Sequence, residues 1–221
     1  GFFAGGKVQI KEGSITRIYK ENVEGDTRKF NLWPIGIVSQ LKINDFLSID
    51  FNSVLGQIID VQEDYVELRV VNGGVVGSNK AVTVNRDLKM NALTEKDKKA
   101  FSLGKEMGIK HVALSFANRG SDVDLIRGHV GDDTFIISKI ESRNGLANLK
   151  DIANKSDAVL IDRGDLSREQ PIERIPILQK AIIKQAKACD TTVYVATNLL
   201  ETMVEQANPT RAEMNDIYNT L

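Results

Sequence analysis

Two short apolar segments in the second half of the chain end abruptly in charged residues. Residues 135–141 (FIISKIE) and 160–165 (LIDRGD) each begin with an apolar run and finish with charged side chains. This pattern is typical of buried parallel strands at the point where their C-terminal ends emerge from the sheet. That edge of the sheet is where α/β barrels and doubly wound enzymes hold their reactive groups. The two segments therefore predict a functional rim, although charge is also simply tolerated at strand ends.

The first part of the chain, from Lys7 to about Arg86, has the pattern of short β-strands. Its apolar runs are bounded by turn residues at intervals of roughly eight to twelve residues, as in small all-β domains. The strand-like runs are 7–10, 46–50, 57–61 and 65–71. We expect them to form a small antiparallel barrel or sandwich.

Residues 71–80 (VNGGVVGSNK) are rich in glycine. Loops of this composition can bind phosphate through their backbone N–H groups. No Gly-Lys-Ser or Gly-Lys-Thr sequence follows, which disfavours a P-loop. We interpret the segment as a hairpin and hinge.

In the remainder of the chain, strands and helices alternate. Thr94 followed by Asp97 predicts the start of a helix that Gly108 ends, and Ser121 with Asp124 predicts the cap of a second helix. The other expected helices are 146–154 and 175–189, and the expected strands are 111–116, 135–140, 158–161 and 192–196. Successive β-α units predict an α/β fold with a parallel sheet and right-handed crossovers.

The number of predicted parallel strands is too small to close a barrel, which takes about eight. The sheet is therefore open, or it is a half-barrel completed by missing chain or by another copy. The pattern changes between residues 86 and 93. This divides the chain into a small β domain over residues 1–88 and an α/β domain over residues 89–221.

The composition excludes several classes of partner. With 42% hydrophobic residues, the 221-residue chain can bury a substantial core. Its 29 basic and 30 acidic side chains nearly cancel, so nothing indicates binding to nucleic acid or to an acidic membrane surface. The chain contains no apolar run of about eighteen residues, which argues against a membrane span.

The single cysteine indicates the redox setting of the chain, and the first residues indicate how the chain is processed. Cys189 excludes an intramolecular disulfide and a site with several cysteine ligands. We expect it to be buried at the end of a helix, in a reducing, cytoplasmic setting. The start, Gly1-Phe2-Phe3, lacks both an initiator Met and the basic region of a signal peptide, so we expect an excised or processed piece.

The residues at the predicted rim have the chemistry of a metal and anion site. Glu141 and Asp165 follow neighbouring strands, and two carboxylates with open water positions suit Mg²⁺ or Mn²⁺. Lys139 shares its strand face with Glu141, and a cation beside a metal stabilises charge on a phosphoryl group or an enolate. Thr197 adds a hydroxyl, and the backbone after Gly164 offers N–H groups to an anion. A salt bridge from Lys139 to either carboxylate, with no ligand, is the structural alternative. Neither histidine in the chain suits a hydrolytic triad.

Several ordered motifs resemble those of the pyruvate kinase family. They are 71–80, Ser115-Phe116 with 121–123, 137–141 (ISKIE), 163–166 (RGDL), Ala196-Thr197 with Leu200-Glu201, and 209–213 (PTRAE). The similarity runs from the first residues to the last. It implies a partial (β/α)8 (TIM-type) barrel that carries a small all-β barrel domain inserted after the third strand.

The resemblance also implies roles for individual residues. Lys139 resembles the lysine that stabilises the phosphoryl group and the enolate, and Thr197 resembles the active-site threonine. Glu141 and Asp165 match the ligands of Mg²⁺ or Mn²⁺. In the substrate-binding segment, Arg163, Gly164 and Asp165 match the family's motif, and the last two would donate backbone N–H groups to the substrate carboxylate. Lys80 lies where the inserted domain carries a lysine on the nucleotide side.

The sequence departs from the family at several positions near this site. Asp162 replaces a small residue, Ser167 replaces glycine, and Asn198 replaces glutamine. The segment Asp50-Phe51-Asn52 stands where the family has paired aspartates and a glycine at the domain hinge. We expect these changes to narrow or recharge the pocket and to affect closure of the small domain.

The resemblance leaves part of the family's site outside this chain. Nothing here matches the first three barrel strands, which hold ligands for the phosphoryl group and for the monovalent cation, K⁺. The implied activity is Mg²⁺-dependent phosphoryl transfer between phosphoenolpyruvate and ADP, giving pyruvate and ATP, in a glycolytic oligomer or a protein completed by missing segments. Two alternatives are a lyase that handles enolpyruvate and a non-catalytic domain that binds a partner.

Overall fold

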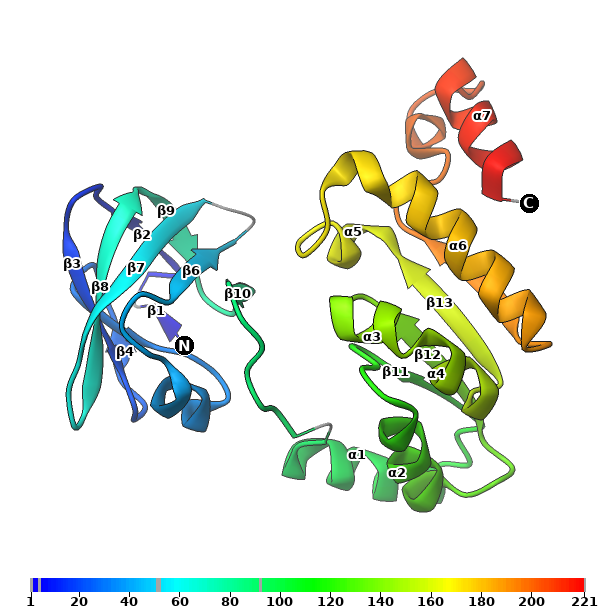
Figure 1. Ribbon diagram of the computed structural model, residues 1–221, viewed down its shortest axis with the longest axis horizontal. Coiled ribbons are helices and arrows are strands. Elements are labelled where there is room, and N and C mark those ends of the chain that lie inside the picture. Colours follow the sequence, from blue (N-terminus) through cyan, green and yellow to red (C-terminus); the bar gives the residue numbers. More distant parts are fainter. Residues whose placement is uncertain (1, 4, 51–52, 92, 221) are drawn as a thin grey trace. The chain divides into compact units, whose positions relative to one another are not determined.

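The computed structural model describes residues 2–3, 5–50, 53–91 and 93–220. The chain forms two compact units, Gly1–Asn91 and Ala92–Leu221 (Figure 1). Phe51 and Asn52, at which the sequence predicts an altered hinge, lie outside the described residues. No helix in the described ranges is both long and apolar enough to cross a bilayer.

The first unit is built almost entirely of short strands. They are β1 (Phe2–Phe3), β2 (Lys7–Ile10), β3 (Ile15–Tyr19), β4 (Glu24–Gly25), β5 (Lys29–Asn31), β6 (Phe46–Ile49), β7 (Val54–Val61), β8 (Tyr65–Asn72), β9 (Gly74–Gly77) and β10 (Val82–Val84), with the 3₁₀ helix η1 (Ile35–Gln40). A six-stranded sheet has the order β10-β6-β7-β8-β3-β5, antiparallel except for the pair β3–β5. Fully buried side chains such as Ile18, Ile58 and Leu68 alternate with exposed ones and form its core.

The glycine-rich segment does not form the expected hairpin, because its residues Gly74–Gly77 form β9, which does not pair with the preceding strand β8. Strand β9 pairs antiparallel with β2, so that Gly74 lies opposite Ile10. A Cβ atom on Gly74 would lie 2.0 Å from the backbone oxygen of Ser53. Glycine is therefore required here because two backbones approach closely. A pairing between segments so far apart in the chain is not encoded by the local composition.

The second unit alternates strands and helices as predicted. Its strands are β11 (His111–Leu114), β12 (Phe135–Ile140), β13 (Ala158–Asp162) and β14 (Thr192–Ala196). Its helices are α1 (Glu95–Glu106), α2 (Gly120–Val130), α3 (Arg143–Ala147), α4 (Leu149–Lys155), α5 (Arg163–Leu166), α6 (Ile175–Ala188) and α7 (Arg211–Thr220), with the 3₁₀ turns η2 (Ile172–Arg174) and η3 (Glu201–Val204). The four strands form one parallel sheet in chain order.

The two faces of this parallel sheet are covered differently. Helices α4 and α6 pack against one face and against each other (Figure 1). On that face Ile136, Ile140 and Ile161 are fully buried. On the other face Leu160 is half-buried, and its register partner Tyr194 is 45% exposed. Around Leu160 and Tyr194, this face of the sheet is therefore only partly covered by the described residues of the second unit.

Helix boundaries confirm some of the expected caps and correct others. Thr94 and Asp97 form the predicted capping box of α1, and Gly108 follows that helix with a φ of 69°. The predicted cap of α2 is wrong. The helix begins at Gly120, before Ser121, and it is Asp122 that accepts the backbone N–H of Arg119. Asp122 lies in the first helical turn and accepts the backbone N–H groups of the two residues before the helix, Asn118 and Arg119.

Three further boundaries differ from the expectation. Strand β11 ends at Leu114 and does not reach residue 116. The helix expected over 146–154 is divided into α3 and α4 at Asn148. Helix α6 ends at Ala188, and Cys189, the residue after it, is half-buried and not fully buried.

An ion pair between a buried aspartate and a half-buried arginine stabilises the first unit and gives it a defined acid sensitivity. Asp45, which is 5% exposed, accepts hydrogen bonds from Arg86 Nε at 2.8 Å, Arg86 Nη2 at 2.9 Å and the Lys42 N–H at 2.8 Å. Burial raises the pKa of Asp45, but these donors outweigh it, and the net pKa lies below 3.8. The pair therefore stabilises the fold above the unfolded-state pKa, and this contribution is lost as the pH falls through the lower folded-state pKa.

We expect Asp45→Asn to lower the free energy of unfolding at pH 7 by about 2 kcal/mol, because it leaves the Arg86 guanidinium without its charged partner. Urea unfolding followed by circular dichroism measures the difference, which should shrink below pH 3.8. Asp64→Asn, at an exposed position of the same unit, is the control. Equal stabilities of Asp45→Asn and the parent at pH 7 would contradict the assignment.

Candidate functional site

The predicted rim forms at the C-terminal ends of three neighbouring strands of the second unit. Lys139 lies near the end of β12, and Glu141 follows that strand directly. Asp162 is the last residue of β13, Asp165 lies in α5, and Thr197 follows β14. Parallel pairing brings these ends together, since Ile140 pairs with Ile161 and Asp162 pairs with Ala196.

Three carboxylates meet at this rim. Glu141, Asp162 and Asp165 each offer an oxygen, and these atoms all lie within 4.8 Å of one another. Glu141 is completely buried, whereas the side chains of Asp162 and Asp165 are 18% and 23% exposed. Like charges held this close repel each other unless a cation lies among them.

The Lys139 ammonium group supplies part of the compensating charge. Its Nζ atom lies 2.6 Å from Glu141 Oε1 and 3.1 Å from Asp162 Oδ2. Burial by itself lowers the pKa of Lys139, but the two carboxylates outweigh burial and raise the net pKa. The amine is therefore protonated at neutral pH and serves as a fixed positive charge.

The Glu141 carboxylate is incompletely satisfied by the protein. Its Oε2 accepts the Phe116 N–H at 2.5 Å, whereas its buried Oε1 has the ion pair with Lys139 but no hydrogen bond of good geometry. Burial, the largest effect, raises the pKa of Glu141, and the Asp165 carboxyl raises it further against the lowering effects of Lys139 and Phe116. A buried oxygen with spare capacity, among other carboxylate oxygens, fits a hard divalent cation such as Mg²⁺ or Mn²⁺.

Backbone conformation at the rim is unusual. Thr197 has a φ of 80°, Asn198 of 57°, and Phe116 of 51°. Residues other than glycine rarely adopt this left-handed backbone conformation, which costs about 1–3 kcal/mol for each residue. Such strained residues are concentrated at functional sites. In this conformation the Thr197 hydroxyl donates to Asp162 Oδ1 at 3.0 Å. The threonine is thus directed toward the carboxylate cluster.

Arg163 has partners of its own. Its Nη1 atom lies 2.7 and 2.8 Å from the two carboxylate oxygens of Asp216 in α7, and its Nε atom donates to the Thr197 carbonyl at 3.1 Å. The guanidinium therefore connects three elements of the fold. Its predicted contact with substrate stays a prediction.

The other residues that the sequence predicts at the site have partners within their own units. A Cβ atom on Gly164 would lie 3.2 Å from Thr197 Cγ2, so the glycine lets the two segments approach. Ser167 donates its hydroxyl to the Gly164 carbonyl, and Asn198 donates to Glu201. Lys80, expected on the nucleotide side, belongs to the first unit, where its Nζ lies 3.2 Å from Asp50 Oδ2.

Arg168 was not predicted at this site, and Asp162 was predicted only as a change that recharges the pocket. Asp162 lies three residues before Asp165, which is the position of a helix cap, and this spacing could have indicated its role. The structure has its Oδ1 accepting the Asp165 N–H at 3.3 Å. Arg168 lies 2.8 Å from Asp165 through Nη2, one helical turn further on, and this spacing could have signalled the ion pair.

The 209–213 motif has a structural role. Glu213 accepts hydrogen bonds from the backbone and the hydroxyl of both Thr202 and Thr210. The Thr202 hydroxyl contributes most to lowering the pKa of Glu213, which falls to about 2. These bonds tie η3, which follows the Thr197 turn, to the start of α7.

Two other features of the second unit contain none of the cluster residues. His111 and His129 pack against the rings of Phe135 and Phe101, which fits structural roles.

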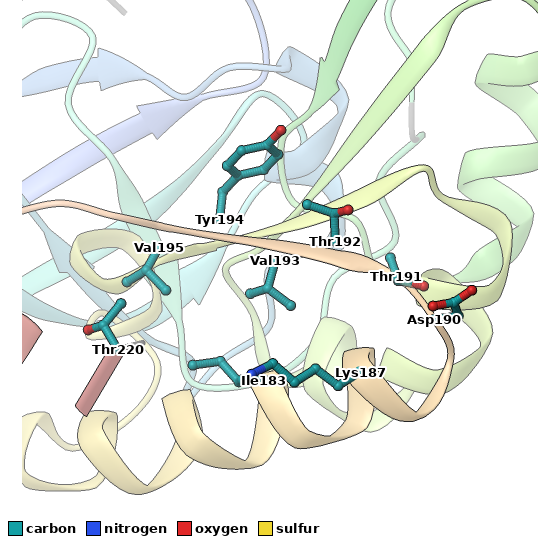
Figure 2. A pocket seen from close by; sticks show the side chains of 9 residues that line it. All are labelled: Ile183, Lys187, Asp190, Thr191, Thr192, Val193, Tyr194, Val195 and Thr220. Atoms are coloured by element: carbon teal, nitrogen blue, oxygen red, sulfur yellow. The ribbon is translucent and has the colours of Figure 1, made fainter. Parts of the chain in front are cut away.

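A hollow of about 550 Å³ lies beside β14, the strand at one edge of the sheet, and Figure 2 shows the side chains that line it. They are Ile183, Lys187, Asp190, Thr191, Thr192, Val193, Tyr194, Val195 and Thr220.

Fold and site together define an α/β protein with a carboxylate-rich rim at the ends of parallel strands, in a chain that also contains a β-rich unit. The sequence model of the pyruvate kinase barrel domain matches residues 1–221. The chain therefore belongs to the pyruvate kinase family, which confirms the resemblance seen in its motifs.

Individual pyruvate kinases are similar over almost the whole chain. That of Clostridium perfringens is 33% identical over 225 residues, covering 99% of this chain and 48% of the relative. That of Thermotoga maritima is 33% identical over 97% of this chain and 47% of its own length. That of Clostridium acetobutylicum is 34% identical over 100% of this chain and 48% of its own length. The chain thus spans about half the length of these relatives.

We expect Glu141→Gln to weaken Mn²⁺ binding by at least about tenfold, because the buried carboxylate is lost and even residues one shell further from a metal have effects of this size. Titration of free Mn²⁺ by electron paramagnetic resonance measures the affinity. Glu106→Gln makes the same chemical change at an exposed position and should bind as the parent does. Equal affinities of Glu141→Gln and the parent would remove Glu141 from the metal site.

Proposed function

We propose that this chain carries the metal and enolate side of a pyruvate kinase active site. In the whole protein, the reaction is phosphoryl transfer between phosphoenolpyruvate and ADP. Membership of the family supports this function over the enolpyruvate lyase and the non-catalytic domain. The observation that carries the proposal is the position of Lys139 between Glu141 and Asp162, with Asp165 at the same strand ends.

Glu141 and Asp165 are the residues that would hold Mg²⁺ or Mn²⁺, with Asp162 close enough to join them. When bound, such an ion neutralises charge on the phosphoryl group and on the enol oxygen. Lys139 adds a permanent positive charge beside the same position, and it stabilises the negative charge that the enol oxygen acquires when the phosphoryl group leaves.

We propose that three donors position the substrate carboxylate. They are the backbone N–H groups of Gly164 and Asp165 and the hydroxyl of Thr197. Arg163 is proposed to support this turn through its bonds to the Thr197 carbonyl and Asp216. Lys80 remains a candidate for contact with the nucleotide. Charge compensation and exact placement are the main contributions a protein can make to phosphoryl transfer.

We further propose that the parallel sheet is part of a (β/α)8 barrel, with residues 1–88 as the small β domain and residues 89–221 as the partial barrel. The sparsely covered face, where Leu160 and Tyr194 lie, supports this, because a barrel interior is filled by such side chains. The remaining strands would come from further chain or from another copy. The greater length of the relatives favours further chain.

Lys139→Met tests the proposed activity in the longest form of the protein that can be prepared. We expect pyruvate formation from phosphoenolpyruvate and ADP to fall by at least about a hundredfold, because the fixed charge that stabilises the enolate is lost. A coupled assay of pyruvate measures the rate. Lys150→Met, at an exposed position of α4, is the control. Equal rates of Lys139→Met and the parent would end this assignment.

A further inference from the structure

The Asp162 side chain is the acceptor on which the donors of the site converge. Its Oδ1 accepts the Thr197 hydroxyl at 3.0 Å and the Asp165 N–H at 3.3 Å. Its Oδ2 lies 3.1 Å from the ammonium group of Lys139. One carboxylate thus bonds to a hydroxyl, a backbone amide and an ammonium group that come from three neighbouring strand ends.

These donors are the groups that an acid would need in order to bind at this site. A carboxylate is recognised by hydrogen bonds from amides and hydroxyls and by a nearby cation. Under the proposed function, on which this inference rests, Lys139, Thr197 and the Asp165 amide serve the substrate. In the structure all three bond to a side chain of the protein itself.

Asp162 is also held in this position. It ends β13, and its backbone pairs with Ala196 in β14, so the main chain cannot carry the carboxylate away without breaking the sheet. The side chain is 18% exposed and mostly enclosed by its partners. An incoming acid therefore has to displace Asp162 by turning its side chain, or has to bind without these donors.

We propose that Asp162 is a built-in competitor of the substrate: its carboxylate occupies the anion-binding donors and lowers the affinity of the site for carboxylate ligands, including phosphoenolpyruvate. The negative charge of Asp162 has opposite effects on the binding of a divalent cation and on the binding of an acid. A third carboxylate within 4.8 Å of the other two strengthens the attraction for a divalent cation. The same charge repels an anion and competes with it for hydrogen bonds.

Asp162→Ala tests this inference with Mn²⁺ and oxalate, a small dicarboxylate, as probes. We expect oxalate to bind the Mn²⁺-saturated variant at least about tenfold more tightly than the parent, since donors and charge become available. Mn²⁺ alone should bind the variant more weakly than the parent. Calorimetry measures oxalate binding, and electron paramagnetic resonance measures Mn²⁺ binding. A residue that only supports the fold would weaken both ligands when removed.

Two further variants make the experiment decisive. Asp162→Asn keeps the shape and one acceptor oxygen but removes the charge, so oxalate affinity should rise by less than in Asp162→Ala. The rise in this variant decides the question if Asp162→Ala fails to fold. Asp133→Ala removes an exposed carboxylate of the same unit and should leave both affinities unchanged.

The outcomes separate this inference from the proposed function. Oxalate affinity that does not rise in either Asp162 variant overturns the inference, even if Mn²⁺ binding and pyruvate formation are as proposed. If the parent does not bind Mn²⁺, the metal assignment fails. The comparison of oxalate binding in EDTA then still decides the inference, because the freed donors and the lost charge favour the anion without any metal.

Discussion

The ammonium group of Lys139 is the interaction on which the rim depends. Three carboxylates converge there, and Lys139 contacts two of them, Glu141 and Asp162. Burial raises the pKa of both carboxyls, and the amine lowers both. The net pKa of Asp162 lies below its ordinary value, whereas that of Glu141, which is fully buried and lies beside the Asp165 carboxyl, remains raised. Lys139, the Asp165 N–H and the Thr197 hydroxyl together favour the ionised form of Asp162, whereas the buried Glu141 Oε1 has no hydrogen bond and can still accept a cation. This difference separates a carboxylate that occupies donors from one that is ready for a metal.

The parallel sheet makes this convergence unavoidable. Because β13 pairs in register with β12 on one side and with β14 on the other, charged residues at the C-terminal ends of adjacent strands come within reach of one another. The alternation of side chains along β12 puts Ile140 into the covered core and leaves Lys139 free to turn toward the rim. Packing of the apolar face and placement of the reactive face are therefore two results of one pattern.

Local sequence signals predicted the elements well and the interactions between them less well. Strand β12 and the Thr94 capping box are encoded within a few residues, and both were found where the pattern puts them. The pairing of β9 with β2 depends on residues far apart, so the local sequence there indicated a hairpin and hinge instead. The role of Asp162 was missed for the same reason, since two of its three partners, Lys139 and Thr197, come from other strands.

The strained turn at Thr197 needs support from outside its own strand, and α7 provides it. A threonine with a φ of 80° stays in that conformation only if surrounding contacts favour it over the ordinary regions. Arg163 accounts for this, because its guanidinium donates to the Thr197 carbonyl while Asp216 in α7 holds the guanidinium. Glu213 fixes the start of the same helix to the segment after Thr197. The orientation of the Thr197 hydroxyl toward Asp162 is therefore set by a helix that contributes no residue to the carboxylate cluster.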